Sequence, residues 1–348
     1  MFTVHPSFSL RNLNTFHLDA QAQYFVRLQH LQDLEDLLES EVYKDNVSLI
    51  LGGGSNVVFV GNYEGLVIQS AMKGIELVEE SDEEVLVRAA AGESWDDLVA
   101  YCVARNWGGL ENLSLIPGTV GAAPIQNIGA YGMEVGECIE WVEGIDLRDG
   151  SYHSFTGREC EFGYRDSIFK RRWKNIFFIS SVTLRLRKKN HQIRVAYGAI
   201  QQTLQAMNCT TPGIDNIRAA VIGIRREKLP DPAITGNAGS FFKNPVVTSS
   251  LFAELQEQYP HIPHFILDNQ LVKVPAAWLI EQCGWKGKIS GRVGVHPQQA
   301  LVLINCGGAT GSEIISLAEN IQTSVREKFG IALMMEVNVI SSQRDVQL

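Results

Sequence analysis

The most constraining feature of the chain is a run of three glycines between two apolar, strand-like segments. Residues 49–60 read LILGGGSNVVFV, so Gly52, Gly53 and Gly54 end one apolar run, and Ser55 and Asn56 precede the next. Glycine lets backbone N–H groups approach an anion closely, and serine and asparagine side chains add donors. The segment therefore predicts either a tight turn between strands or a cradle for a pyrophosphate.

This glycine run is not the fingerprint of a Rossmann dinucleotide-binding domain. The third glycine of G-x-G-x-x-G is replaced by Val57, and a strand-like run follows where a helix should begin. The sequence therefore disfavours a nicotinamide-type Rossmann domain.

A second glycine-rich segment, LIPGTVGAAPIQNIGAYG at residues 115–132, has neither helical nor strand periodicity. A loop of this length is usually functional, although a long packed loop is the plain structural alternative. Its Gly118, Gly121 and Gly129 lie among apolar side chains, with Asn127 as one of few polar groups. Such surroundings suit a flat, largely apolar ligand with polar edges, for example an isoalloxazine ring.

Charge and composition exclude several classes of protein. The net charge of −9 gives no general footprint for nucleic acid, and no apolar run is long enough for a membrane helix. The N-terminus has no signal-peptide pattern, so we expect a cytoplasmic protein. No C-x-x-C pair or zinc-like spacing occurs, so we expect no metal and reduced core thiols. The cysteines are Cys102, Cys138, Cys160, Cys209, Cys283 and Cys306.

The periodicity along the chain predicts an α+β protein with more than one domain. Leucines near residues 31–38 share a helical face, Ser94 can cap a helix, and Asp149-Gly150 can turn a hairpin. A new unit is expected near residue 211, with helices at 249–259, 275–283 and 312–329. A last strand at 331–340 is expected to return to the earlier sheet. Basic residues of FKRRWK and VTLRLRKK suggest a solvated face rather than a phosphate platform.

Three residues are candidates for chemistry, each with a structural alternative. Arg165, in GYRDSIFK, can stabilise negative charge or simply pair with Asp166. Ser240, in GNAGSFFKNP, can donate a proton or serve a turn. Glu336 lies in the apolar segment IALMMEVNVI, where a carboxylate needs a partner or a proton, so we expect either a protonated acid or a salt-bridged edge residue.

The ordered stretches LGGGSNVVF, IPGTVGAAPIQNIGAYG, GYRDSIFK, KLPDP and NAGSFFKNP resemble the UDP-N-acetylenolpyruvoylglucosamine reductases (MurB), flavoproteins of peptidoglycan precursor synthesis. The resemblance runs from about residue 14 to about residue 340 and favours the type I branch. It implies a vanillyl-alcohol-oxidase-type FAD-binding module of two subdomains, 1–70 and 71–210, with residues 330–348 returning to it. Residues 211–329 are then a separate α/β substrate-binding domain.

The resemblance also implies the reaction and its residues. NADPH reduces non-covalently bound FAD, which then reduces the enolpyruvyl ether of UDP-N-acetylglucosamine to UDP-N-acetylmuramate. The catalytic set is Arg165, Ser240 and Glu336, with Ser240 as the proton donor. The cofactor-binding set is Gly52, Gly53, Gly54, Ser55, Asn56, Ile116, Pro117, Gly118, Gly121, Asn127 and Gly129. The substrate-binding set is Tyr197, Arg225, Lys228, Asn244, Phe265 and Gln299, where Phe265 replaces a tyrosine common in this branch.

Two alternatives remain open from the sequence. The chain can be another flavin oxidoreductase of the same superfamily, although neither glycine segment carries a histidine or cysteine to tether the flavin. It can also be a nucleotide-sugar-binding protein without catalysis, which retention of all three catalytic candidates disfavours. We expect a monomer with no nucleic-acid or membrane partner.

Overall fold

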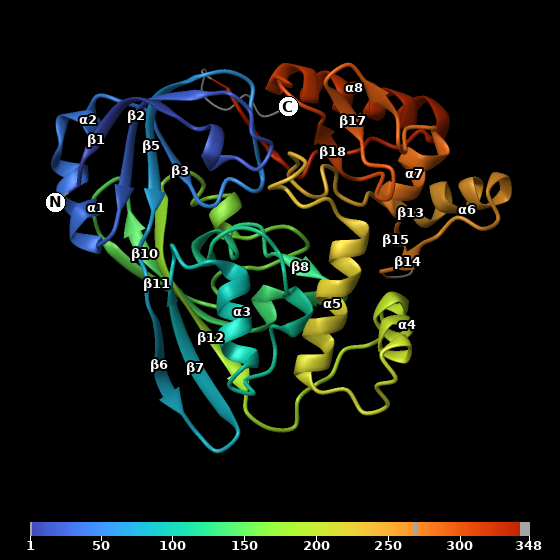
Figure 1. Cartoon of the computed structure of the whole chain (residues 1–348), viewed down its shortest axis with the longest axis horizontal. Coiled ribbons are helices and arrows are strands. Elements are labelled where there is room, and N and C mark those ends of the chain that lie inside the picture. Colours follow the sequence, from blue (N-terminus) through green and yellow to red (C-terminus); the bar gives the residue numbers. More distant parts are fainter. Residues whose placement is uncertain (1, 268–269, 342–348) are drawn as a thin grey trace. The chain divides into compact units, whose positions relative to one another are not determined.

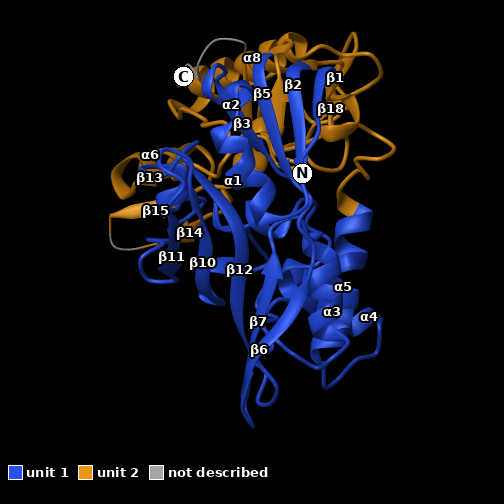
Figure 2. Ribbon diagram, turned by 90° about the vertical axis from the view of Figure 1, so that its left-hand side faces the viewer, with its two compact units in different colours: residues 1–8, 22–53, 64–227 blue, residues 9–21, 54–63, 228–348 orange. Residues whose placement is uncertain are grey.

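A computed structural model describes residues 2–267 and 270–341, and the chain divides into two compact units. The first unit comprises residues 1–8, 22–53 and 64–227, and the second comprises residues 9–21, 54–63 and 228–348 (Figure 2). The chain therefore crosses between the units more than once. The expected boundary near residue 211 differs from the observed one, which falls between Glu227 and Lys228.

A four-stranded sheet of order β1-β2-β5-β3 opens the first unit (Figure 1). Helix α1 (Leu31–Glu39) buries Leu34 and Leu37 in the core beside this sheet, as the leucine spacing predicts. Strand β3 pairs in parallel with β5 and ends directly before the glycine run. The other elements are β1 (Val4–Ser9), β2 (Gln21–Leu28), β3 (Ser48–Leu51), β5 (Tyr63–Ser70) and α2 (Glu41–Lys44).

A five-stranded antiparallel sheet of order β11-β10-β12-β7-β6 forms the larger part of the first unit. Helix α3 (Trp95–Val103) buries one apolar stripe in its core, and the Ser94 hydroxyl caps it by accepting from the Asp97 N–H, as predicted. The predicted hairpin at Gly150 is confirmed between β10 and β11. The strands are β6 (Ile75–Glu80), β7 (Glu84–Ala90), β10 (Ile139–Asp146), β11 (Tyr152–Thr156) and β12 (Phe177–Arg187).

Helices α4 (Gly198–Ala206) and α5 (Ile214–Lys228) pack together in the first unit. The sequence correctly predicts the buried stripe of α5, but it assigns this helix to a new domain. The helix is held in the first unit because its stripe faces α4 and because Arg218 pairs with Asp96 of α3 at 2.6 Å. Between these elements, residues 108–132 form 3-10 turns and the short strand β8 (Gly129–Ala130), which pairs with β9 (Met133–Glu134).

The second unit builds its core from three helices and several short strands. Helices α6 (Ser249–Gln258), α7 (Ala276–Gln282) and α8 (Gly311–Phe329) confirm the three predicted helices. Phe241 and Phe242 are buried in the same core. The two antiparallel sheets have the orders β13-β15-β14 and β16-β17-β18. Their strands are β13 (Val246–Thr248), β14 (Phe265–Ile266), β15 (Leu271–Lys273), β16 (Ile289–Ser290), β17 (Val293–Val295) and β18 (Leu303–Asn305).

The predicted strand at 331–340 is too long. Only β19 (Asn338–Ile340) is a strand, and it pairs in parallel with β4 (Val57–Phe59) of the second unit. The preceding residues run beside 241–243 instead, where Met335 and Phe242 form an isolated bridge, so Glu336 lies outside any strand. Residues 342–348 of the predicted returning segment lie outside the described residues.

Several basic side chains on β12 and after it pair with acids. Arg185 pairs with Glu84 and Glu140, and Lys188 pairs with Glu80. Arg171 of the FKRRWK segment pairs with Glu161. These exposed ion pairs support the prediction of a solvated face rather than a phosphate platform.

Candidate active site

Ser240 and Glu336, far apart in the sequence, lie on neighbouring segments of the second unit. The Glu336 N–H donates to the carbonyl oxygen of Phe241, the residue after Ser240, at 2.8 Å. The Lys243 N–H donates to the Met334 carbonyl at 2.9 Å, which continues the antiparallel pairing. The side chain of Asn56 donates to the Glu336 carbonyl at 3.3 Å. The second unit thus gathers a hydroxyl, a carboxyl and the residues after the glycine run.

Ser240 is exposed and directly precedes the buried residues Phe241 and Phe242. Its backbone forms a bridge with Val302, and the Phe241 N–H donates to the Leu301 carbonyl at 2.8 Å. The preceding turn is served by another side chain, because Asn237 Oδ1 accepts from the Gly239 N–H at 2.9 Å. The turn therefore has its own polar side chain, and Ser240 is an exposed residue beside it.

The remaining substrate candidates of the second unit differ in their surroundings. Asn244 Oδ1 accepts from the Ala276 N–H at the start of α7, so part of this amide already serves the fold. Gln299 Oε1 accepts from the Leu301 N–H at 3.4 Å. Phe265 is 51% exposed on β14, and Lys228 is exposed at the end of α5.

The two glycine segments meet within the first unit. A Cβ placed on Gly53 would lie 2.9 Å from the Cα of Gly118, and one on Gly52 would lie 2.9 Å from the Thr119 hydroxyl. Gly118 has a φ of +124°, which glycine adopts readily. Among the described residues, the N–H groups of Gly53 and Gly118 donate to no protein atom. Close backbones with available N–H donors are the chemistry that an anion cradle requires. Gly54, Ser55 and Asn56 belong to the second unit.

Asn127 and Arg165 together organise the second half of the loop. The Asn127 amide donates to Glu134 at 2.7 Å and to the Gly163 carbonyl, and its oxygen accepts from the Gly136 N–H. Arg165 donates to the Gly129 carbonyl at 2.7 Å, and a Cβ on Gly129 would lie 2.9 Å from the same guanidinium. The sequence leaves open an ion pair between Arg165 and Asp166. The Asp166 carboxylate pairs with Arg171 at 3.1 Å, so Arg171 holds it in place.

Tyr131, Tyr197 and Arg225 form a second cluster of the first unit. The two tyrosine rings meet edge to face at 5.3 Å, and Tyr197 is 49% exposed. Burial raises the pKa of Tyr131, although Arg225 opposes this shift through its charge and a hydrogen bond. Burial lowers the pKa of Arg225, and the charges of Tyr131 and Asp96 oppose that shift. The Nε of Arg225 also donates to the Leu115 carbonyl at 3.2 Å.

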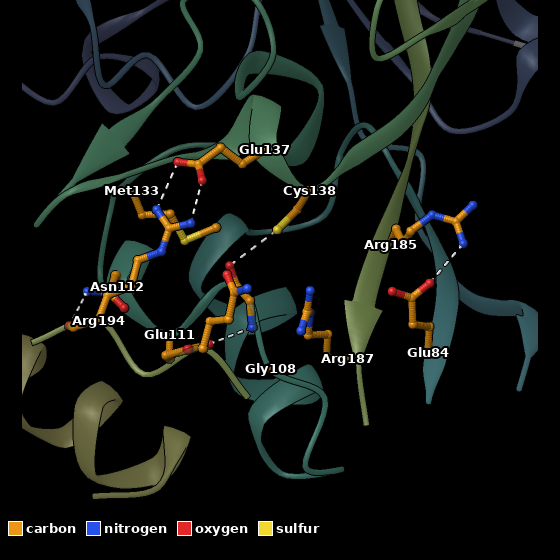
Figure 3. A pocket seen from close by; sticks show the side chains of 12 residues that line it. Glu84, Gly108, Glu111, Asn112, Met133, Glu137, Cys138, Arg185, Arg187 and Arg194 are labelled. Atoms are coloured by element: carbon orange, nitrogen blue, oxygen red, sulfur yellow. Dashed lines mark hydrogen bonds and ion pairs between the residues drawn. The ribbon is translucent and has the colours of Figure 1, made fainter. Parts of the chain in front are cut away.

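A cavity of about 240 Å³ in the first unit contains none of the predicted site residues (Figure 3). Two ion pairs lie in its walls, Arg194 with Glu137 and Arg185 with Glu84. The thiol of Cys138 donates to the Gly109 carbonyl at 3.4 Å, and burial raises its pKa to about 12. This thiol therefore stays protonated near neutral pH and is a poor nucleophile.

The family models define the class of protein first. Residues 22–156 match the FAD binding domain, and residues 231–340 match the C-terminal domain of UDP-N-acetylenolpyruvoylglucosamine reductase. The predicted fold class, an α+β protein with an FAD-binding module of the vanillyl-alcohol-oxidase type and a separate C-terminal domain, is confirmed. The described residues contain no helix long and apolar enough to cross a bilayer.

The chain belongs to the UDP-N-acetylenolpyruvoylglucosamine reductase family. It is 44% identical to the reductase of Flavobacterium johnsoniae, covering 97% of this chain and 99% of the relative. It is 46% identical to that of Bacteroides fragilis, over 97% of this chain and 100% of the relative. The reductase of Thermus caldophilus has the same fold, with a TM-score of 0.68, 22% identity and coverage of 97% and 99%.

The residues of the first unit fit an FAD. The N–H groups of Gly53 and Gly118 supply donors where a side chain on Gly53 would collide, which suits a pyrophosphate. The half-buried Ile116 and Ile128 supply apolar surface for a ring. Because the polar atoms of Asn127 serve the loop itself, we expect this residue to shape the site rather than to reach the cofactor.

Some residues that shape the site escape a sequence analysis. Leu115 has a φ of +59°, which a leucine rarely adopts, and no sequence pattern announces it. In the sequence, Tyr131 stands out only as an aromatic residue inside a glycine-rich loop. Asn237, by contrast, was detectable, because asparagine two residues before glycine commonly closes such a turn.

Proposed function

We propose that this chain uses NADPH and bound FAD to reduce the enolpyruvyl group of UDP-N-acetylglucosamine enolpyruvate to UDP-N-acetylmuramate, in peptidoglycan precursor synthesis. Family membership supplies the reaction class. The observation that carries the assignment of residues is the hydrogen bond from the Glu336 N–H to the Phe241 carbonyl, which sets Ser240 beside Glu336. We further propose that the protein is a cytoplasmic monomer; all six of its cysteines are free thiols, as a reducing compartment allows.

When bound, FAD supplies a hydride to the methylene carbon of the enol ether. Negative charge then develops on the substrate carboxylate, and preorganised donors are needed to receive it. Arg165 suits this role, since a guanidinium stays protonated and offers two parallel N–H donors. Its contact with the Gly129 carbonyl fixes its orientation before any substrate arrives.

The carbon beside the carboxylate must then receive a proton. Ser240 offers an exposed hydroxyl on a rigid anchor, because Phe241 and Phe242 behind it are completely buried. Glu336, on the adjoining segment, is half-buried and supplies a carboxyl group for the same chemistry. Ser240 therefore delivers the proton, and Glu336 contacts the developing enolate.

Six side chains are proposed to contact the nucleotide sugar. Tyr197 and Arg225 of the first unit and Phe265 of the second offer aromatic and cationic surface for a uridine diphosphate. Further contacts are proposed for Lys228, Asn244 and Gln299.

Ser240→Ala tests the assignment by separating the two half-reactions. We expect reduction of FAD by NADPH at the wild-type rate, and reoxidation by the enolpyruvyl substrate slowed about 10³-fold, as for loss of a general acid. Both steps are followed by flavin absorbance in a stopped-flow instrument. Ser290→Ala, at another exposed serine of the second unit, is the matched control. Equal loss in both half-reactions would reject Ser240 as the proton donor.

A further inference from the structure

Leu115 adopts a left-handed backbone conformation at the start of the segment that carries Ile116, Pro117 and Gly118. Its φ is +59°. This conformation is strained in leucine, because the Cβ comes too close to the following carbonyl oxygen, whereas glycine has no Cβ. Such residues persist only where surrounding groups hold them. The groups that bond the Leu115 peptide therefore help to determine the backbone conformation of this segment.

The first turn of α3 contacts both ends of the segment. The Asp96 carboxylate accepts from the Leu115 N–H at 2.5 Å, and the Trp95 N–H donates to the Gly118 carbonyl at 3.1 Å. From the other side, Arg225 donates to the Leu115 carbonyl at 3.2 Å. Both the N–H and the carbonyl of the strained residue are thus bonded to charged side chains.

Asp96 is itself fixed by a second arginine of α5. Arg218 Nη1 lies 2.6 Å from Oδ1 and Nη2 lies 3.0 Å from Oδ2, a two-pronged pair whose side chains are only 16% and 25% exposed. Burial alone would raise the pKa of Asp96, but the Arg218 hydrogen bond and the Leu115 N–H lower it overall. Arg218 and Arg225 stand seven residues apart on α5, so one face of this helix reaches the Asp96 carboxylate and the Leu115 carbonyl.

We propose that Asp96 and Arg218 are positioning residues for FAD binding. They hold the Leu115 peptide in its left-handed conformation, and this fixes the backbone of Gly118 against that of Gly53. Neither residue needs to touch the cofactor. The inference rests on the proposed function in one respect, the assignment of residues 116–118 to FAD.

The test is retention of FAD by full-length holoprotein after dilution, measured as the rise in fluorescence of released flavin. Asp96→Asn removes the charge that Arg218 holds, and we expect about ten-fold weaker FAD binding. Asp97→Asn, an exposed carboxylate in the same first turn, is the matched control and should bind FAD as the wild type does. Wild-type retention by folded Asp96→Asn, verified by near-UV circular dichroism, would overturn the proposal.

If Asp96→Asn does not fold, FAD retention is measured on Arg218→Lys instead. Lysine keeps the positive charge but cannot form the two-pronged pair, so we expect about three-fold weaker FAD binding. Binding as tight as in the wild type would count against the proposal.

A rescue experiment separates positioning from general damage. Glycine adopts a φ near +59° without strain, so Leu115→Gly added to Asp96→Asn should restore FAD binding by about three-fold. Absence of any recovery would show that the carboxylate does not act through the Leu115 conformation. Because flavin release requires neither NADPH nor the sugar, this result is independent of the Ser240→Ala test and of the proposed reaction.

Discussion

The two units prepare their candidate residues in opposite ways. In the first unit, Asn127, Arg165 and Arg225 already donate to backbone carbonyls or acids of the protein. In the second unit, Ser240 and Phe265 present exposed side chains. These three residues of the first unit therefore form a preformed cradle, whereas these two residues of the second unit remain exposed.

The difference follows from the backbone that each unit must satisfy. Residues 108–132 form little regular structure, so side chains such as Asn127 must take over hydrogen bonds that a helix or sheet would provide. The segment around Ser240 pairs with residues 301–302 and 334–336 through its backbone instead. Asn237 and Asn244 still accept backbone N–H groups there, whereas the Ser240 side chain is left exposed.

Among the tests of this comparison, Arg165→Lys should give the largest effect, because it breaks the preformed cradle at a group that we propose to act in catalysis. Lysine lacks the planar guanidinium that donates to the Gly129 carbonyl and keeps further N–H donors. We expect kcat for the sugar to fall by about 10²-fold or more, with the flavin absorbance spectrum unchanged. Arg171→Lys, in an exposed ion pair, should retain activity. Comparable activity losses in the two variants would contradict the assignment.

The same substitution at two asparagines sharpens the comparison of the units. Asn127→Asp removes two donors and sets a second carboxylate against Glu134, so we expect a loss of about 3 kcal/mol in the stability of the first unit. Asn244→Asp keeps the oxygen that accepts from the Ala276 N–H and should be nearly neutral. Differential scanning calorimetry measures both. Equal destabilisation would mean that the two side chains are not used differently.

Acid should weaken the first unit through Asp96. The pKa of this carboxyl is lowered from its ordinary 3.8, so its contribution is fully present above pH 3.8 and is lost as pH falls through the lowered folded value. We expect Asp96→Asn to cost about 2 kcal/mol in stability at neutral pH, a charged hydrogen-bond effect. The gap to the wild type should stay constant from pH 7 to 5 and narrow below pH 4. A difference in stability between the two proteins that grows as the pH falls would contradict this prediction.

Phe265→Ala should give the smallest effect. The ring is half exposed, so its loss should leave stability unchanged and weaken binding of the nucleotide sugar by about 1 kcal/mol, roughly five-fold. Isothermal titration with the uridine nucleotide measures this difference. Ile289→Ala, another exposed apolar residue of the second unit, is the control. Unaltered affinity in Phe265→Ala would remove Phe265 from the substrate site.

Local features of the fold were accessible to sequence reasoning where a pattern repeats over several residues. The leucines of α1, the Ser94 cap and the stripes of α3 and α5 each bury one face of a helix, and a helical period states this directly. The predicted strand at 331–340 is longer than β19 because apolar and polar residues alternate around Glu336, as they do in a strand. In the structure this alternation reflects a bridge to Phe242 rather than a ladder.

The sequence by itself determined the cofactor class, since the order of its glycine segments and of the motifs around Arg165 and Ser240 is specific to one family. Only the tertiary structure decided which side chains stay available. It paired Asp96 with Arg218, gave Leu115 its left-handed backbone and set Glu336 beside the Ser240 segment. These contacts join residues distant in the chain, and such pairing depends on how the elements pack rather than on local periodicity.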